Sequence, residues 1–147
     1  MVVSDLERVL SVERQAYSFP WTRGNFVDSL AAGYLAELLL DPADALLGYY
    51  VAMVGVDELH LLNLTVAPRH QRQGHAVRLL DVLEQRCRER HLPQLWLEVR
   101  VGNARARHVY LRRGFVEVGL RPRYYPAGQG AREDAVVMRR EVPEMQP

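Results

Sequence analysis

Residues 66–80 combine the features that bind a phosphate group. An apolar, β-branched run ends at Val66, a short polar loop with several basic residues follows, and an amphipathic helical pattern begins near Gly74. The first backbone N–H groups of a helix have no partner within the helix, and the helix dipole places partial positive charge there. Gly74 lets the backbone come close to a ligand, and Ala76 is too small to block it. The segment therefore predicts an anion site, although it has neither the Gly-Lys-Ser/Thr ending of a nucleotide P-loop nor the spacing of the dinucleotide fingerprint.

Three polar residues further along the chain could carry out proton transfer or hold a ligand. Glu98 lies near the end of a short buried strand over 95–99, where ligands bind in open α/β sheets. Asn103 is placed to cap the helix that follows, and Tyr110 lies two turns into that helix. Each residue also has a plain structural interpretation: an ion pair with an arginine for Glu98, a helix cap for Asn103 and a packed ring for Tyr110.

The elements that must position these residues follow from periodicity, caps and turn residues. Helices are predicted from a Ser4–Glu7 capping box to about Tyr17, from Thr22 to about Leu30, over 74–91, and from Asn103 to about Arg113 with Gly114 as the terminator. Strands are predicted over 34–40, 46–56, 59–66, 95–99, 115–125 and 132–138. The strand–helix alternation in the middle predicts parallel pairing there, and the hairpins at both ends predict antiparallel edges. The fold class is therefore α/β, with a mixed sheet covered by helices.

Composition limits the classes of protein that this chain can belong to. We expect one domain over 1–141 and a frayed tail over 142–147, because 147 residues are too few for two ordinary domains. The net charge of +1 gives no nucleic-acid footprint, and no apolar run approaches the length of a membrane span. A single cysteine, Cys87, and a polar start without a signal-peptide layout favour the cytoplasm. The five histidines lack metal-site spacing, so we expect no metal and place them at the surface or at caps.

Nearly the whole chain, from about Ser4 to Met138, resembles the Gcn5-related N-acetyltransferase (GNAT) family. Within that family it is similar to the RimI group of bacterial enzymes, which acetylate the N-terminal alanine of ribosomal proteins. The resemblance is carried by Phe19-Pro20-Trp21, Leu61 to Val66, Gln71 to Ala76, Leu95 to Arg100, Gly102-Asn103, Tyr110, Gly114-Phe115 and Tyr124-Tyr125-Pro126. It implies a mostly antiparallel sheet whose parallel central pair splays at the cofactor site, flanked by about four helices.

The resemblance also implies an acetyl-CoA site and a role for each matching residue. Backbone of Leu64, Thr65 and Val66 would contact the acetyl group and pantetheine arm, and Arg72, Gln73, Gly74, His75, Ala76 and Val77 would surround the pyrophosphate. Asn103 would hydrogen-bond the pantetheine or adenylate arm. Glu98 is implied as the proton acceptor and Tyr110, beside the thioester, as the proton donor. Trp21, Tyr124 and Tyr125 would line the groove for the acceptor, the N-terminus of a ribosomal protein.

Reference pKa values indicate how Glu98 and Tyr110 could act. An α-amine has a pKa of about 8 and a glutamate carboxyl one of about 4.3, so outright deprotonation by Glu98 is uphill by about 5 kcal/mol. Either burial raises the pKa of Glu98, or a water relays the proton once attack has made the nitrogen acidic; we favour the relay. Transfer from a phenol to a thiolate is uphill by only about 2 kcal/mol, so a hydrogen bond from Tyr110 would suffice. An N–H of Thr65 or Val66 could hold the carbonyl oxygen.

Two other functions fit the same cofactor loop. One is acetylation of a small amine, a polyamine or an antibiotic, and the other is a CoA-binding interaction module without turnover. The Tyr124-Tyr125-Pro126 loop favours a peptide acceptor, and the presence of both Glu98 and Tyr110 argues against a module without turnover. The sequence departs from the RimI pattern at a short N-terminal opening, at Gly102 and at Ala76, and none of these touches Glu98 or Tyr110.

Overall fold

The computed structural model describes residues 1–144 and divides into two compact units. The first unit contains Met1–Val54 and Leu62–Asp81, and the second contains Gly55–Leu61 and the chain from Val82 onward. The four α-helices are α1 (Leu6–Ala16), α2 (Arg23–Ala31), α3 (His75–Glu89) and α4 (Ala104–Arg112). The six strands are β1 (Leu35–Leu40), β2 (Leu46–Val54), β3 (Glu58–Val66), β4 (Gln94–Arg100), β5 (Val116–Pro126) and β6 (Arg132–Glu141). Both β3 and α3 contribute residues to each unit.

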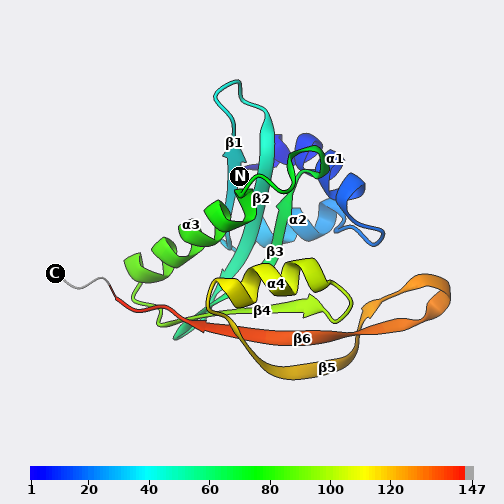
Figure 1. Ribbon diagram of the computed structural model, residues 1–147. Helices are drawn as coiled ribbons and strands as arrows, with labels where there is room; N and C mark the ends of the chain where they lie inside the picture. Colours follow the sequence, from blue (N-terminus) through cyan, green and yellow to red (C-terminus); the bar gives the residue numbers. More distant parts are fainter. Residues whose placement is uncertain (145–147) are drawn as a thin grey trace. The chain divides into compact units, whose positions relative to one another are not determined.

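The strands follow the order β1-β2-β3-β4-β6-β5 (Figure 1). β3 pairs with β4 in parallel, and the β1–β2, β4–β6 and β5–β6 pairs are antiparallel. This arrangement confirms the predicted mixed, mostly antiparallel sheet with one parallel pair and four helices. Among the described residues, no helix is long and apolar enough to cross a membrane.

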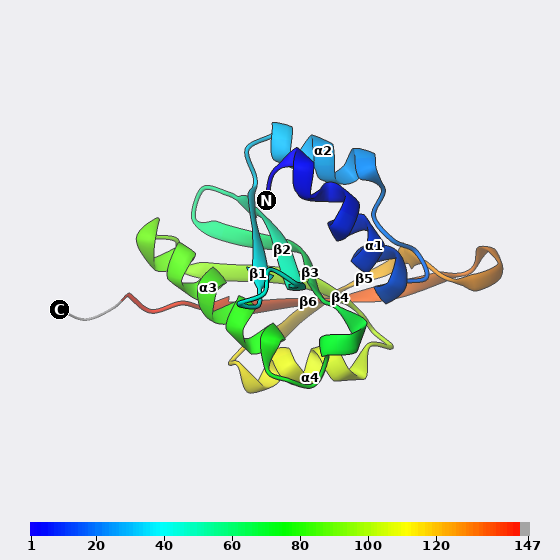
Figure 2. The same cartoon turned by 90° about the horizontal axis from the view of Figure 1, so that it is seen from above.

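The first unit is built around a core between its helices and its strands. α1 and α2 lie side by side in both ribbon views (Figures 1 and 2). Apolar residues recur along α1 at helical spacing, so one face of that helix is buried. The core residues are Leu6, Val9, Leu10, Phe26, Tyr49 and Val51. Gly48 allows β2 to approach β3 closely, because a Cβ at this position would lie 2.6 Å from the carbonyl oxygen of Thr65.

Of the two helix N-terminal caps predicted in the first unit, one is confirmed and the other is wrong. Thr22 caps α2 as predicted, with its hydroxyl accepting from the N–H of Asn25 at 3.1 Å. The predicted Ser4–Glu7 capping box is wrong. Ser4 lies inside a 3-10 turn, Val3–Asp5, and α1 begins only at Leu6. The carboxylate of Asp5 instead accepts a hydrogen bond from the N–H of Val2 at 2.8 Å. Val2, and not Ser4, is therefore the residue that precedes the turn.

The two faces of the sheet in the second unit have different surroundings. Leu95, Leu97 and Val99 of β4 are buried on one face, and Trp96, Glu98 and Arg100 alternate onto the other. α4 lies along one face of this sheet (Figure 2). Arg140, opposite Leu95 in the β4–β6 register, hydrogen-bonds the carbonyl of Arg113 at the C-cap of α4. α4 therefore covers the face that carries Leu95, and Glu98 belongs to the opposite face.

A buried carboxylate joins three elements of the second unit. Glu84 on α3 is 4% exposed and contacts Arg113 at 3.2 Å and Arg140 at 2.5 Å. All nineteen basic residues of the chain are arginine, so guanidinium groups form every such ion pair that does not involve histidine. Of the tail that was predicted to fray, Val142 is buried and its N–H donates to the carbonyl of Pro93 at 2.8 Å. Residues 145–147 of that tail lie outside the described residues.

Candidate active site

In the first unit, the loop between β3 and α3 has the backbone that the sequence predicted. After β3 comes a short 3-10 turn, Pro68–His70, and α3 begins at His75. Gly74 adopts φ +82°, which favours glycine, and Arg72 is also left-handed at φ +63°. The N–H of Arg78 donates to the carbonyl of Gly74, which closes the first helical turn. The amides of the first turn are therefore left without intrahelical acceptors, as an anion site requires.

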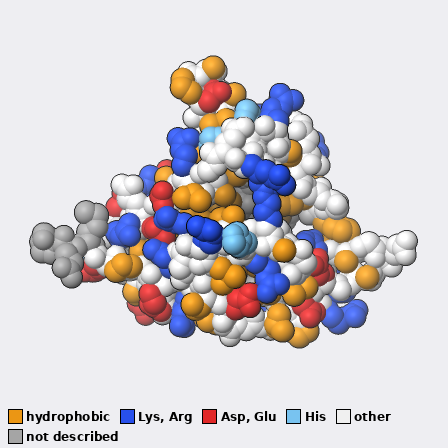
Figure 3. All heavy atoms as spheres, in the orientation of Figure 1, with side chains coloured by type: hydrophobic (Ala, Val, Ile, Leu, Met, Phe, Trp, Pro, Cys, Tyr) orange, Lys and Arg blue, Asp and Glu red, His pale blue; other side chains and the backbone are white. Residues whose placement is uncertain are grey.

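Arginine and histidine side chains surround this loop. Figure 3 shows arginine and histidine side chains gathered over the segment between β3 and α3. His75 bonds Gln73 at 3.3 Å and Arg78 at 3.4 Å. Partial burial, together with the charges of Arg78 and His70, holds the pKa of His75 below its usual value, which favours the neutral ring.

A hydrogen-bond network fixes the end of β3 in the same unit. Glu13 is 1% exposed, and its Oε1 accepts from Tyr49 at 2.6 Å and from Asn63 at 3.1 Å. The hydroxyl of Thr65 donates to Asn63 Oδ1 at 2.7 Å, so Tyr17 is the donor in its own 2.7 Å bond to Thr65. The Tyr17 hydroxyl also contacts the carbonyl of Leu64 at 3.1 Å. Desolvation raises the pKa of Tyr17 to about 12, so it remains a donor.

This network changes the expectation for the β3 segment. The side chain of Thr65 is used within the protein, and the carbonyl of Leu64 is in contact with the Tyr17 hydroxyl. Contacts from this strand to a ligand are therefore left to the remaining backbone groups of Leu64, Thr65 and Val66. Glu13 and Tyr17 were missed by the sequence analysis, because neither stands in a chemical motif.

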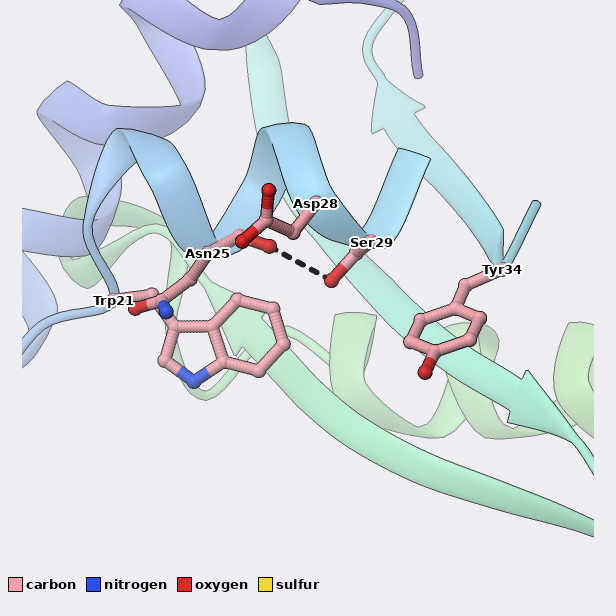
Figure 4. Close-up of a pocket in the computed structure, with 5 residues that line it drawn as sticks. All are labelled: Trp21, Asn25, Asp28, Ser29 and Tyr34. Carbon is pink, nitrogen blue, oxygen red and sulfur yellow. Dashed lines mark hydrogen bonds between the residues drawn. The ribbon is translucent and has the colours of Figure 1, made fainter. Parts of the chain in front are cut away.

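Trp21, predicted to contact the acceptor, lines a pocket of about 360 Å³ in the first unit (Figure 4). The other lining residues are Asn25, Asp28, Ser29 and Tyr34. The ring of Trp21 packs on Phe26 with 5.1 Å between centroids, and its backbone N–H donates to Glu13 Oε2 at 2.9 Å. The same buried carboxylate therefore positions both the Trp21 loop and the end of β3.

In the second unit, Glu98 is held by His60 and Arg121. Its side chain is 8% exposed, with Oε2 2.8 Å from His60 Nε2 and Oε1 3.3 Å from Arg121 Nε. Burial alone would raise the pKa of Glu98. The hydrogen bond and charge of His60, together with the charge of Arg121, outweigh burial and hold the pKa of Glu98 below its usual value. This direction is opposite to the one that a base strengthened by burial, the first of the two routes considered for the proton, would need.

Tyr110 and Asn103 both belong to the α4 side of the second unit. Tyr110 is 8% exposed, and its ring lies 5.5 Å from that of Phe115. Asn103 caps α4 as predicted, because its Oδ1 accepts from the N–H of Ala106 at 3.2 Å. Since α4 covers the face opposite Glu98, the predicted proton donor and proton acceptor come from opposite sides of this sheet.

Tyr124 and Tyr125 lie at an irregularity between β5 and β6. The register shifts between Arg121 and Tyr125, and Arg123 adopts φ +54° within this interval. The two tyrosine rings meet edge to face at 4.9 Å. The guanidinium of Arg121 lies 5.4 Å from the ring centroid of Tyr124, while Arg100 lies 4.5 Å from that of Tyr125. Arg121 thus joins Tyr124 and Glu98 in one cluster.

The predicted residues therefore fall into two groups. The first unit holds Trp21, Leu64, Thr65, Val66 and the loop Arg72–Val77, and the second holds Glu98, Asn103, Tyr110, Tyr124 and Tyr125. Sequence analysis missed His60 and Arg121, the two partners of Glu98. His60 was assigned to the surface or a cap, and that assignment is wrong, because its side chain is 22% exposed and bonded to Glu98. Alternation along β3 could have placed it on a sheet face, but not its partner on another strand.

Comparison with known proteins agrees with this arrangement. The model of the acetyltransferase (GNAT) family matches residues 6–115. The chain is 36% identical over 138 residues to the ribosomal protein bS18-alanine N-acetyltransferase of Haemophilus ducreyi, covering 94% of each chain. It is 29% identical over 139 residues to a protein of Bacillus subtilis described as a putative enzyme of the same kind, covering 94% of this chain and 90% of that one.

A solved structure gives the same result. The crystal structure of the ribosomal-protein-S18-alanine N-acetyltransferase from Escherichia coli matches with a TM-score of 0.89 and 34% identity, over 100% of this chain and 93% of that one. The chain therefore belongs to the acetyltransferase (GNAT) family and is an acetyl-CoA-dependent N-acetyltransferase.

Proposed function

We propose that this enzyme transfers the acetyl group of acetyl-CoA to the N-terminal alanine amine of a small-subunit ribosomal protein of the bS18 type. The observation that carries the proposal is the similarity, over almost the whole length of both chains, to enzymes with that acceptor. The aromatic pair Tyr124–Tyr125 beside the Glu98 cluster supports a peptide acceptor. The reaction would take place where ribosomal proteins are made, in the cytoplasm.

In this proposal, the pyrophosphate of the cofactor binds to the predicted loop of the first unit. The unpaired amides that follow Gly74, with the surrounding arginines, suit the pyrophosphate, and acetyl-CoA supplies the thioester when bound. The residues predicted for this role are Arg72, Gln73, Gly74, His75, Ala76 and Val77. Asn103, which also caps α4, would contact the pantetheine or adenylate arm. The two roles are compatible, because an amide side chain has both donors and an acceptor.

Proton transfer in this proposal uses Glu98 and Tyr110. The ionised Glu98 attracts the cationic N-terminus of the acceptor, and it accepts the amine proton through water as the C–N bond forms. The lowered pKa of Glu98 makes direct abstraction before attack even less favourable than about 5 kcal/mol. Tyr110 donates a hydrogen bond to the departing thiolate as the C–S bond breaks. Burial of the Tyr110 ring suits this task, since it fixes the phenol in one place.

The test is acetyl transfer by the purified protein to synthetic peptides that differ only at residue 1, followed by thiol release and by the mass of the peptide. Transfer to peptides that begin with alanine, and not to spermidine or aminoglycosides, is the expected result. Release of thiol with small amines alone would replace the proposal by small-molecule acetylation. If calorimetry detects binding of acetyl-CoA but no acetyl group is transferred to any acceptor, the protein is an interaction module.

The role of Tyr110 has its own prediction. Tyr110→Phe should lower kcat roughly 30-fold, the equivalent of about 2 kcal/mol, because the thiolate loses one hydrogen bond. The KM for acetyl-CoA should change by less than about threefold, since binding of the nucleotide does not use the phenol. Tyr50→Phe, which removes a phenol hydroxyl that bonds Glu37 in the first unit, is the matched control. Unchanged turnover of Tyr110→Phe in steady-state kinetics would remove Tyr110 from the mechanism.

A further inference from the structure

His60 contacts the reacting carboxylate from a neighbouring strand. It lies opposite Trp96 in the parallel β3–β4 register, so its side chain shares a sheet face with Trp96 and Glu98. Its Nε2 is 2.8 Å from Glu98 Oε2, the length of a charge-assisted hydrogen bond. The side chain of His60 is 22% exposed and that of Glu98 is 8% exposed, so the bond is largely shielded from water.

The other charged groups on this face are accounted for. Arg121, from β5, occupies the second oxygen of Glu98. Arg100, on β4, bonds Glu133 and the carbonyl of Pro126. Arg139, on β6, lies 5.6 Å from the ring centroid of Trp96 and 3.4 Å from Glu141. His60 is therefore the titratable partner of Glu98 among these groups, since arginine does not lose its proton in proteins.

Building on the proposed function, we propose that His60 positions Glu98 and, in place of the carboxylate itself, is the group on which the proton of the acceptor amine comes to rest. With Glu98 ionised, the contact requires Nε2–H of His60 as donor, which fixes the tautomer and leaves the lone pair on Nδ1. As the C–N bond forms and the C–S bond breaks, one proton leaves the amine nitrogen. It passes through water to Nδ1, and the product is an imidazolium paired with the carboxylate.

Acidity favours the imidazole over the carboxylate as the acceptor. The gap between an α-amine and a free carboxyl is about 3.5 pKa units, and between the same amine and a free imidazole it is about 1.5. Two units correspond to a roughly 100-fold larger fraction of transferred proton. Arg121 disfavours a proton on Glu98 further, because it stabilises the carboxylate. The partly exposed ring of His60 then returns the proton to solvent between turnovers.

Two variants separate proton uptake from positioning. His60→Gln retains an N–H donor for Glu98 but cannot take up a proton, and His60→Leu removes both functions. His91→Gln, on an exposed residue paired with Glu144, is the control for loss of a histidine. The readout is kcat from pH 5.5 to 9 with a saturating alanine-initiated peptide and saturating acetyl-CoA. Thermal melting checks that each variant is folded.

The expected result is a 10- to 100-fold loss of kcat in both His60 variants, with the KM for acetyl-CoA within about threefold of wild type. Protonation of the acceptor amine lowers the rate on the acid side in every variant, so wild type and variants are compared at pH 9, where most of the amine is neutral. Full rescue of kcat by His60→Gln at this pH would overturn the assignment of the proton to His60.

A second measurement does not depend on the acceptor. Titration of the Glu98 carboxyl by ¹³C NMR in the free enzyme should give a higher pKa for Glu98 in His60→Leu than in wild type, because the hydrogen bond and charge that lower it are lost, and a smaller rise in His60→Gln, which keeps a donor. An unchanged Glu98 midpoint in both variants would refute the pair itself. If wild type acetylates none of the peptides, the proposed function fails while this titration still decides whether the pair exists.

Discussion

Removal of the Glu13 carboxylate should destabilise the first unit more than any surface change in the same helix. Two buried donors, the hydroxyl of Tyr49 and the amide of Asn63, share Oε1 of Glu13, and the N–H of Trp21 uses Oε2. Each buried donor left without an acceptor costs about 1–3 kcal/mol. Glu13→Ala should therefore lower the free energy of unfolding by about 4 kcal/mol, which corresponds to a fall in Tm of about 10 °C for a chain of this size.

A milder substitution distinguishes the hydrogen bonds of the two carboxylate oxygens of Glu13. Glu13→Gln can retain Oε1 for Tyr49 and Asn63, but its NH₂ then faces the N–H of Trp21, and two donors cannot bond each other. We expect a loss of about 1–2 kcal/mol, together with a higher KM for the acceptor peptide and an unchanged KM for acetyl-CoA. The reason is that the Trp21 loop loses its anchor while the β3 network remains.

Urea unfolding followed by circular dichroism measures both effects. Glu7→Ala is the matched control, since it removes an exposed carboxylate from the first turn of the same helix. A Glu13→Ala protein within about 1 kcal/mol of this control would refute the argument, because it would mean that Tyr49 and Asn63 find other acceptors at no cost.

Three further predictions concern the second unit. Burial raises the pKa of the Cys87 thiol to about 11, so iodoacetamide at pH 8 should modify Cys87 only after unfolding, as followed by mass spectrometry. Glu84→Ala leaves two guanidinium groups without their buried carboxylate, and urea unfolding should show a loss of about 3 kcal/mol against little change for the exposed Glu89→Ala. The folded-state pKa of Glu98 is depressed, so its contribution to stability is present above pH of about 4.3 and is lost as the pH falls through the folded pKa. The stability difference between wild type and Glu98→Gln should therefore shrink from pH 6 to pH 3, and a constant difference would contradict the ion pair.

Local features of the fold could be predicted from the sequence, because their causes lie within a few residues. The cap at Thr22, the cap at Asn103 and the left-handed Gly74 each depend on neighbouring backbone. The exception is also local. Ser4 matched the capping pattern, but the carboxylate of Asp5 accepts from the N–H of Val2 and the chain forms a 3-10 turn over Val3–Asp5 instead.

The partners of the candidate site residues could not be predicted, because they come from distant parts of the chain. Glu98 and His60 are 38 residues apart, and Glu13 and Asn63 are 50 apart. Only strand order and register bring such pairs together, and periodicity reports neither. The residues with a family motif were found, whereas the groups that set their protonation and orientation were not.

The exclusive use of arginine has a consequence for an enzyme that works with an activated thioester. Thioesters acylate free amines slowly without any catalyst, and a protein surface normally offers them many lysine side chains. This chain offers no ε-amine, so the guanidinium partners of Glu84, Glu98 and Glu133 cannot be neutralised in this way. The charges that hold the fold and the site are thus chemically inert toward the enzyme's own donor substrate.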